Sequence, residues 1–266
     1  MNTSLLPPLP KPALIWGLLA GLVCAAALLL SLHSWDLAVF YWLNTQGRNM
    51  PLAAELITHL ADHGWAAPLL VLLLAKQPRM LAAALVAALL IHLSVRELKH
   101  FFVVLRPCFD PTMAAQVFTA GPDLNLDSYS FPSGHSATAS LIAACLVARW
   151  GKRAFWPAVL FALLAAASRS LLGVHFPSDT TTGLALGLVI SAGAFYLSAQ
   201  LNLGTGRAAL LLSLLVWLLA GAVLIFILST GQHNFPSWFR LASKAGCLLA
   251  LGVVLWQAVR AALSRT

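Results

Sequence analysis

Charged residues are scarce in this chain. Asp, Glu, Lys and Arg together make up only 9% of its 266 residues, whereas hydrophobic residues make up 60%. A soluble domain carries roughly 25% charged residues, so this composition excludes an ordinary soluble protein. Apolar runs of about 17 to 25 residues, each long enough to cross a bilayer, recur along the chain instead. The sequence therefore predicts a polytopic membrane protein whose core consists of spans packed against one another.

Cysteine is also rare, and its spacing excludes two further classes of protein. The four cysteines are Cys24, Cys108, Cys145 and Cys247. Three of them lie inside apolar runs, and the sequence has no CxxC pair and no Cys/His cluster with the spacing of a zinc site. The spacing therefore indicates neither a disulfide framework nor a structural metal. We interpret the cysteines as small apolar packing residues.

Strand-like alternation is absent as well, so the apolar runs predict helices and an all-α membrane bundle. By length and hydropathy, about eight of them are candidate spans. They lie near 13–32, 63–75, 80–100, 135–149, 154–171, 180–200, 208–229 and 241–262. The first run exceeds the apolar part of a signal peptide, so we expect it to be retained. The second is short unless it begins in the preceding segment.

Two connecting segments are long. Residues 33–63 carry aromatic residues such as Trp35 and Trp42, which favour the membrane–water interface, and we expect one or two short surface helices there. Residues 107–131 are rich in Pro, Asp, Ser and Gly, which predicts a loop.

Three short stretches concentrate polar residues that are costly so close to hydrocarbon. They are KHFFVVLRP at 99–107, PSGHS at 132–136 and SRSLLGVHFPSD at 168–179. If the spans alternate in direction, all three stretches reach the same membrane face. We therefore expect them to converge on one pocket near the interface.

Charge distribution predicts which face this is. With a cytoplasmic N-terminus, the short loops KQPR and RWGKR are cytoplasmic and basic, as the positive-inside rule requires. Nine of the 16 basic residues then lie on the cytoplasmic side: Lys11, Lys76, Arg79, Arg149, Lys152, Arg153, Arg207, Arg260 and Arg265. All eight acidic residues lie on the other side. We expect a bacterial inner membrane protein with a periplasmic site, and because this topology accounts for the net charge of +8, no nucleic-acid partner is expected.

The three stretches together predict a phosphate site. Lys99, Arg106 and Arg169 can neutralise an oxyanion, and arginine can do so bidentately. Ser133 and Gly134 precede a predicted helix, whose first backbone N–H groups bind anions. Fixed cations and N–H donors are what phosphoryl transfer mainly requires.

Two histidines divide the expected chemistry. His175 and Asp179 are spaced i, i+4, which puts them on one face of a helix. A carboxylate bonded to one ring nitrogen fixes the tautomer and leaves the other nitrogen free to attack, so His175 is the candidate nucleophile and forms a phosphohistidine. His135 can protonate the leaving oxygen and later activate water. Only Asp179 among the carboxylates lies within the stretches, so no metal cofactor is expected.

The three stretches resemble the signature of the type 2 phosphatidic acid phosphatase family, integral membrane lipid phosphatases related to vanadium haloperoxidases. The signature has Lys and Arg-Pro separated by six residues, then PSGH, then Ser-Arg followed by His and Asp. Every position matches: Lys99, Arg106, Pro107, Pro132, Ser133, Gly134, His135, Ser168, Arg169, His175 and Asp179.

This resemblance implies His175 as nucleophile, Asp179 as its partner and His135 as general acid. It implies a phosphate site without metal, formed by Lys99, Arg106, Ser133, Gly134 and Arg169. The resemblance covers roughly residues 13–200, the six-helix core of the family. Residues 1–12 remain as a cytoplasmic lead, and residues 201–266 as two additional C-terminal spans that line lipid access, mediate oligomerisation or add packing.

The leading hypothesis is a lipid phosphatase acting on a phosphomonoester or pyrophosphate. The motifs are expected to bind a phosphate group, which all four candidate lipids carry: undecaprenyl pyrophosphate, phosphatidylglycerol phosphate, phosphatidic acid and lipid A. The alternative is a phosphotransferase that passes the phosphate to a second lipid such as lipid A. A non-catalytic lipid-binding or transport protein is less consistent with intact His135, His175 and Asp179, and a haloperoxidase is disfavoured because those relatives are soluble.

Overall fold

The computed structural model describes residue 21 and residues 35–120, 129–200, 207–230 and 236–263. Within these residues the chain is helical and contains no strand, which confirms the predicted all-α class. The α-helices are α2 (Trp35–Asn49), α3 (Pro51–His59), α4 (His63–Leu74), α5 (Pro78–Phe102), α6 (Gly134–Trp150), α7 (Lys152–Leu171), α8 (Pro177–Gln200), α9 (Arg207–Ser229) and α10 (Ser237–Leu263). The predicted span at 13–32 and the lead at 1–12 lie outside the described residues, apart from residue 21.

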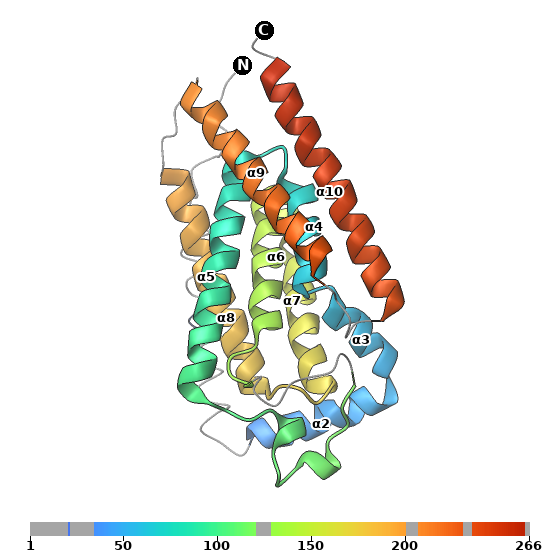
Figure 1. The fold of residues 1–266 in the computed structure, drawn as a ribbon. Coiled ribbons are helices and arrows are strands. Elements are labelled where there is room, and N and C mark those ends of the chain that lie inside the picture. Colours follow the sequence, from blue (N-terminus) through green and yellow to red (C-terminus); the bar gives the residue numbers. More distant parts are fainter. Residues whose placement is uncertain (1–20, 22–34, 121–128, 201–206, 231–235, 264–266) are drawn as a thin grey trace.

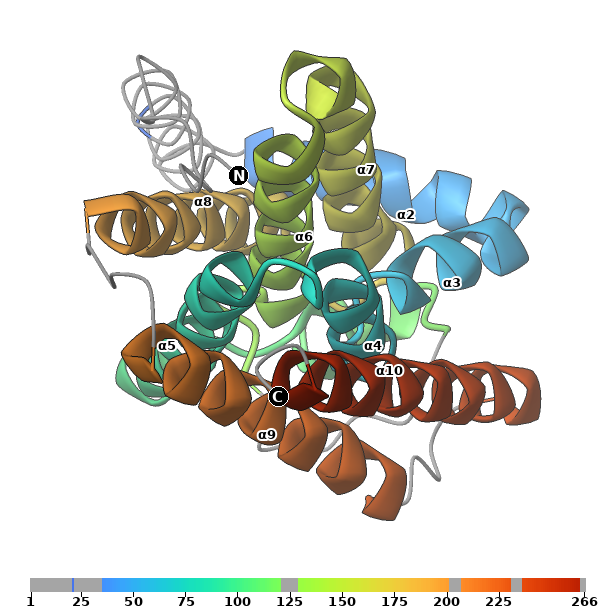
Figure 2. The ribbon, with the colours of Figure 1, turned by 90° about the horizontal axis from the view of Figure 1, so that it is seen from above.

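Helix α6 lies at the centre of the bundle, enclosed by α4, α5, α7 and α8 (Figure 2). Its buried positions are mostly small, including Ala137, Ala139, Ala143 and Cys145, which lets the four neighbours approach closely. Helices α9 and α10 pack on the outside, α10 against α4 and α9 against α5 and α10. Helix α2 runs across the end of the bundle at which α5 ends and α6 and α8 begin (Figure 1).

Five described helical segments are long and apolar enough to cross a membrane, and a bent pair adds a sixth. The five contain α5, α7, α8, α9 and α10. Helix α6 matches the span expected at 135–149 within one residue at each end, but its 17 residues make it shorter than these five segments. The physical reason is its central position, since a helix covered by four neighbours does not have to match the thickness of the lipid by itself.

The bent pair is α3 and α4, which meet at 50°. Asp62 ends the break between them, because its carboxylate Oδ1 accepts the backbone N–H of Gly64 at 2.8 Å and caps α4. The short span expected at 63–75 corresponds to α4, which together with α3 is long and apolar enough for one bent span. Of the one or two surface helices expected within 33–63, α2 is one, whereas α3 forms the bent pair with α4. Two 3₁₀ turns, η1 (Pro107–Phe109) and η2 (Ala114–Gln116), interrupt the loop expected at 107–131.

Two glycines of α8 set its distance from α6. A Cβ at Gly183 would lie 2.3 Å from the carbonyl oxygen of Ser133, and a Cβ at Gly187 would lie 2.3 Å from that of Ala137. Ser140 Oγ also donates to the carbonyl oxygen of Leu184 at 2.9 Å. The missing side chains therefore allow backbone contact between the two helices whose N-termini carry the second and third sequence motifs.

Candidate active site

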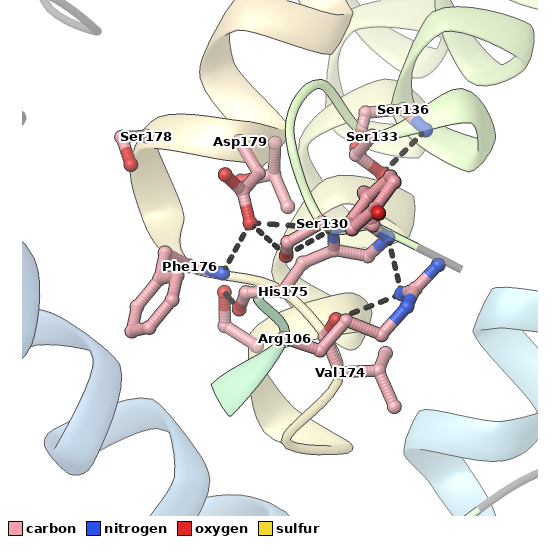
Figure 3. A network of polar contacts seen from close by, with 12 residues as sticks. Arg106, Ser130, Ser133, Ser136, Val174, His175, Phe176, Ser178 and Asp179 are labelled. Carbon is pink, nitrogen blue, oxygen red and sulfur yellow. Dashed lines mark hydrogen bonds and ion pairs between the residues drawn. The ribbon is translucent and has the colours of Figure 1, made fainter. Parts of the chain in front are cut away.

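The His175–Asp179 pair lies at the start of α8, at the end of the bundle covered by α2 (Figure 3). His175 Nδ1 is 3.3 Å from Asp179 Oδ2, and both side chains are buried. The backbone N–H of Phe176 donates to the same carboxylate oxygen at 2.8 Å. Pro177 starts the helix where no N–H donor is needed. The i, i+4 contact predicted from the sequence is therefore present.

Arg106 determines which nitrogen of His175 carries the proton. Arg106 Nη1 lies 3.0 Å from His175 Nε2 and 2.9 Å from the carbonyl oxygen of Val174. A guanidinium group has only donors, so Nε2 must be the acceptor and hold a lone pair. The proton is then on Nδ1, facing Asp179. The two neighbours select the tautomer in which Nε2 holds the lone pair.

Ser130 is a member of this group that sequence reasoning missed. Its hydroxyl donates to Asp179 Oδ2 and lies 3.2 Å from His175 Nδ1. Its backbone N–H donates to the carbonyl oxygen of Val104 at 2.7 Å, which joins the segment after α5 to the segment before α6. A serine in a loop rich in Ser and Asp gives no signal by itself; the one available sequence signal is its position two residues before the PSGH stretch.

The predicted cations are gathered at the same end of the bundle. Arg106 and Arg169 are buried, and Arg169 Nη1 donates to Thr58 Oγ1 at 2.7 Å. Among the described residues, Arg169 Nε is buried without a hydrogen-bond partner. Lys99 Nζ donates to the carbonyl oxygens of Tyr129 and Ser130. A buried N–H donor on a cation is a favourable partner for an anion.

Ser133 and Gly134 open α6 as predicted. Ser133 is its N-cap, and its hydroxyl accepts the backbone N–H of Ser136 at 3.4 Å. The backbone N–H of Ser133 donates to the carbonyl oxygen of Asp179 at 3.0 Å, which ties the second motif to the third. A Cβ at Gly134 would meet only Val95 Cγ1, at 3.5 Å. The first turn of α6 thus begins beside the His175–Asp179 pair.

His135 follows on the first turn of α6 but contacts a carboxylate that the motifs do not contain. Its Nε2 lies 3.6 Å from Asp62 Oδ2. Asp62 was missed because one carboxylate between two apolar runs is usually interfacial, and its proximity to His135 depends on the packing of α4 against α6. Asp36 was missed for a similar reason. It accepts the backbone N–H and the hydroxyl of Ser178 and so caps α8 from α2.

Burial and neighbouring cations act on the titration of His175, which lies between the segments of α7 and α8 that can span a membrane. Burial lowers the pKa of this imidazole well below its usual value, and the nearby charges of Arg106 and Lys99 lower it further. The neutral form required of a nucleophile is therefore favoured over a wider range of pH.

No cluster of three or more His, Cys, Asp or Glu side chains within the described ranges is arranged to hold a metal ion. The polar groups at this end of the bundle are instead cations, hydroxyls and backbone donors around two imidazoles. Such a set can bind an oxyanion, present a nucleophilic nitrogen to it and move one proton.

Comparison with known proteins agrees with this chemistry. Residues 79–203 match the model of the PAP2 superfamily, and all eight predicted site residues lie in this range. The undecaprenyl-diphosphatase of Sulfolobus acidocaldarius is 30% identical over 142 residues, which cover 53% of this chain and 65% of that protein. The alignment thus spans slightly less than two thirds of the relative's length.

Two solved structures are also similar. The crystal structure of Aquifex aeolicus LpxE has a TM-score of 0.54 and 27% sequence identity, covering 61% of this chain and 96% of that chain. A transmembrane PAP2-type phosphatidylglycerolphosphate phosphatase from Bacillus subtilis has a TM-score of 0.49 and 24% identity, covering 70% of this chain and 95% of that chain.

Proposed function

We propose that the protein is a membrane lipid phosphatase with a histidine nucleophile, because residues 79–203 match the model of the PAP2 superfamily. The observation that carries the proposal is the line of contacts from Arg106 through His175 to Asp179. In these contacts Nε2 of the neutral His175 ring faces the guanidinium group of Arg106. A phosphate bound by the cation would therefore be beside the nucleophile.

The first chemical step transfers the phosphoryl group to His175. Nε2 forms a bond to phosphorus while the bond from phosphorus to the lipid oxygen breaks. His135 in its protonated form gives its proton to that oxygen. The Nδ1–H of His175 stays with Asp179, whose negative charge stabilises the positive phosphohistidine.

The second step releases inorganic phosphate. His135, now neutral, takes a proton from water, and the resulting oxygen forms a bond to phosphorus while the bond to Nε2 breaks. Arg106, Arg169 and Lys99 bind the charge that spreads over the equatorial oxygens in both steps, and the N–H groups at the start of α6 contribute donors. His175 is regenerated neutral, and His135 is regenerated in its protonated form.

The substrate class follows from the same groups. A phosphomonoester or a pyrophosphate on a lipid fits, and undecaprenyl pyrophosphate, phosphatidylglycerol phosphate, phosphatidic acid and lipid A are the candidates. The site lies at the end of the bundle opposite the short α4–α5 and α6–α7 connections, which carry Lys76, Arg79, Lys152 and Arg153 (Figure 1). By the positive-inside rule we propose that this site faces the periplasm of a bacterial inner membrane.

Phosphate release from undecaprenyl pyrophosphate and from phosphatidic acid tests the proposal. The purified protein in detergent is expected to release phosphate from at least one of them, with the same rate in EDTA. A folded sample that releases none, but labels a second lipid when one is added, would be a phosphotransferase. A sample that binds the lipids and does neither would be a non-catalytic binding protein.

Asp179→Asn is expected to lower kcat by about 10⁴-fold while leaving the fold intact. The amide keeps the shape of the carboxylate but loses the negative charge that holds the Nδ1–H tautomer and stabilises the phosphohistidine. Initial rates with saturating substrate and the melting temperature check both parts of this expectation. Turnover equal to that of the wild type would remove Asp179 from the site.

The pH dependence of kcat/KM follows from the environment of His175. The lowered pKa of His175 means that the imidazole stays neutral, and nucleophilic, as the pH falls below the ordinary histidine value. The acid limb of kcat/KM is therefore expected to lie below about pH 6.5. A ³¹P titration of the lipid in the same micelles identifies any limb that belongs to the substrate. An enzyme limb at or above that pH would contradict the expectation.

A further inference from the structure

The break between α3 and α4 holds a buried carboxylate, that of Asp62, outside the segment that matches the PAP2 superfamily. Only 2% of Asp62 is exposed. Its Oδ1 accepts the N–H of Gly64, and its Oδ2 lies 3.6 Å from His135 Nε2 and 3.4 Å from His63 Nδ1. A buried carboxylate is strongly destabilising unless its charge is compensated, so these contacts account for its presence.

We infer that Asp62 is a positioning residue for His135: its carboxylate lies beside Nε2 of His135 at ion-pair distance, orients the ring and stabilises the protonated imidazole that serves as general acid. The inference rests on the proposed phosphatase function and extends it to a residue outside the three motifs. It gives each catalytic histidine its own carboxylate, Asp179 for the nucleophile and Asp62 for the acid.

The charges around His135 explain why such a group is required. Burial has the largest effect against a protonated ring at this position, followed by the charge of Arg169 on α7. His63 on α4, when it is protonated, and Arg106 after α5 act in the same direction. His175, before α8, is a further titratable neighbour. Asp62 acts in the opposite direction, since its negative charge favours the protonated ring. A cationic site that must also contain a protonated imidazole needs such an anion.

The break is held in place from both sides. On the inner side, Thr58 accepts a hydrogen bond from Arg169. On the outer side, Ser243 Oγ of α10 donates to the carbonyl oxygen of Gly64 at 2.6 Å, and the ring of Phe239 lies 4.5 Å from that of His59. Helix α10 thus fixes the segment that carries Asp62. This contact gives the additional C-terminal helices a structural connection to the site.

Asp62→Asn separates the charge of this residue from its role as a helix cap. Asparagine caps helices as well as aspartate does, so the hydrogen bond to Gly64 is retained. We expect kcat to fall about tenfold near pH 7.5, with KM changed by less than about twofold, because the neutral amide no longer stabilises protonated His135. The basic limb should move to lower pH, and the difference from the wild type should shrink as the pH falls and His135 of the variant becomes protonated.

Asp110→Asn is the matched control, since this carboxylate caps a turn at Thr112 and is not part of the site. It should leave the profile unchanged. Asp62→Ser, which also keeps a capping oxygen, is the second variant if Asp62→Asn does not fold. A wild-type profile in a folded Asp62 variant, or a rate loss of the same size at every pH, would overturn the inference.

A second measurement is independent of turnover. In ¹⁵N-histidine NMR spectra of the detergent-solubilised protein, the titration midpoint of His135 should be lower in Asp62→Asn than in the wild type, and an equal midpoint would overturn the inference. Wild-type protein without phosphatase activity, or with activity that survives His175→Ala, would instead refute the proposed function. The NMR comparison still tests the Asp62–His135 pair in that case.

Discussion

Replacing His175 with alanine is expected to lower phosphate release by about 10⁴- to 10⁶-fold, the range seen when a covalent nucleophile is removed. The substitution deletes Nε2, the nitrogen that Arg106 and Asp179 together leave with a lone pair. The hydroxyl of Ser130 cannot replace it, because it already donates to Asp179. Initial rates over several hours, corrected for spontaneous hydrolysis, measure the loss.

The control for this variant is a histidine outside the site. His92 lies exposed in the middle of α5, so His92→Ala should retain wild-type turnover. Quenching the wild type in alkali during turnover of a labelled lipid should trap a phosphohistidine, which is stable in base and labile in acid, and His175→Ala should trap none. Substantial hydrolysis by a folded His175→Ala protein would exclude the covalent mechanism.

The residues that could be predicted from the sequence are those that lie together along the chain. Lys99 and Arg106 flank the end of one helix, Ser133 and His135 open another, and the last motif supplies both partners of the nucleophilic pair. Backbone geometry alone brings such neighbours to one helix end. Alternation of the spans then puts the three helix ends on one face, and the structure brings them together there.

Ser130, Thr58 and Asp62 could not be predicted in this way. Each reaches the site through packing between segments that are distant in sequence, such as the contact of Thr58 with Arg169 across 111 positions. The sequence shows that these three side chains are polar, but it does not show which distant residue each of them contacts. The break after α3 could not be predicted for the same reason. Hydropathy identifies an apolar segment, but it does not show the 50° bend that brings Asp62 close to α6.

The span predicted at 135–149 matches α6, Gly134–Trp150, within one residue at each end, although 17 residues are few for a helix that crosses a bilayer. A span is expected to match the membrane when lipid surrounds it, but α6 is surrounded by protein. Ser133, the N-cap of α6, is fully buried. Lipid-facing α9 and α10 follow the expected lengths closely, with exposed apolar side chains such as Leu218 and Leu241.

Arg106→Lys is expected to lower kcat/KM by about 10²- to 10³-fold, although the charge is conserved. Arg106 Nη1 contacts both His175 Nε2 and the carbonyl oxygen of Val174, which requires a planar group with several donors in fixed directions. An ammonium group is a point charge on a flexible stem, so it cannot hold the nucleophile and bind two phosphate oxygens at the same time. Inhibition by inorganic phosphate should also weaken in this variant, because the Arg106 guanidinium group is expected to bind this product as well.

Arg48→Lys provides the matched comparison for this substitution. Arg48 is exposed on α2 and donates to the carbonyl oxygen of Gln116 at 3.4 Å, so the same chemical change there should alter neither turnover nor phosphate inhibition. If Arg106→Lys behaved like Arg48→Lys, net positive charge would be the sole contribution of Arg106. The tautomer of His175 would then have to be set by Asp179 alone, because a lysine would no longer supply the donor in the required direction.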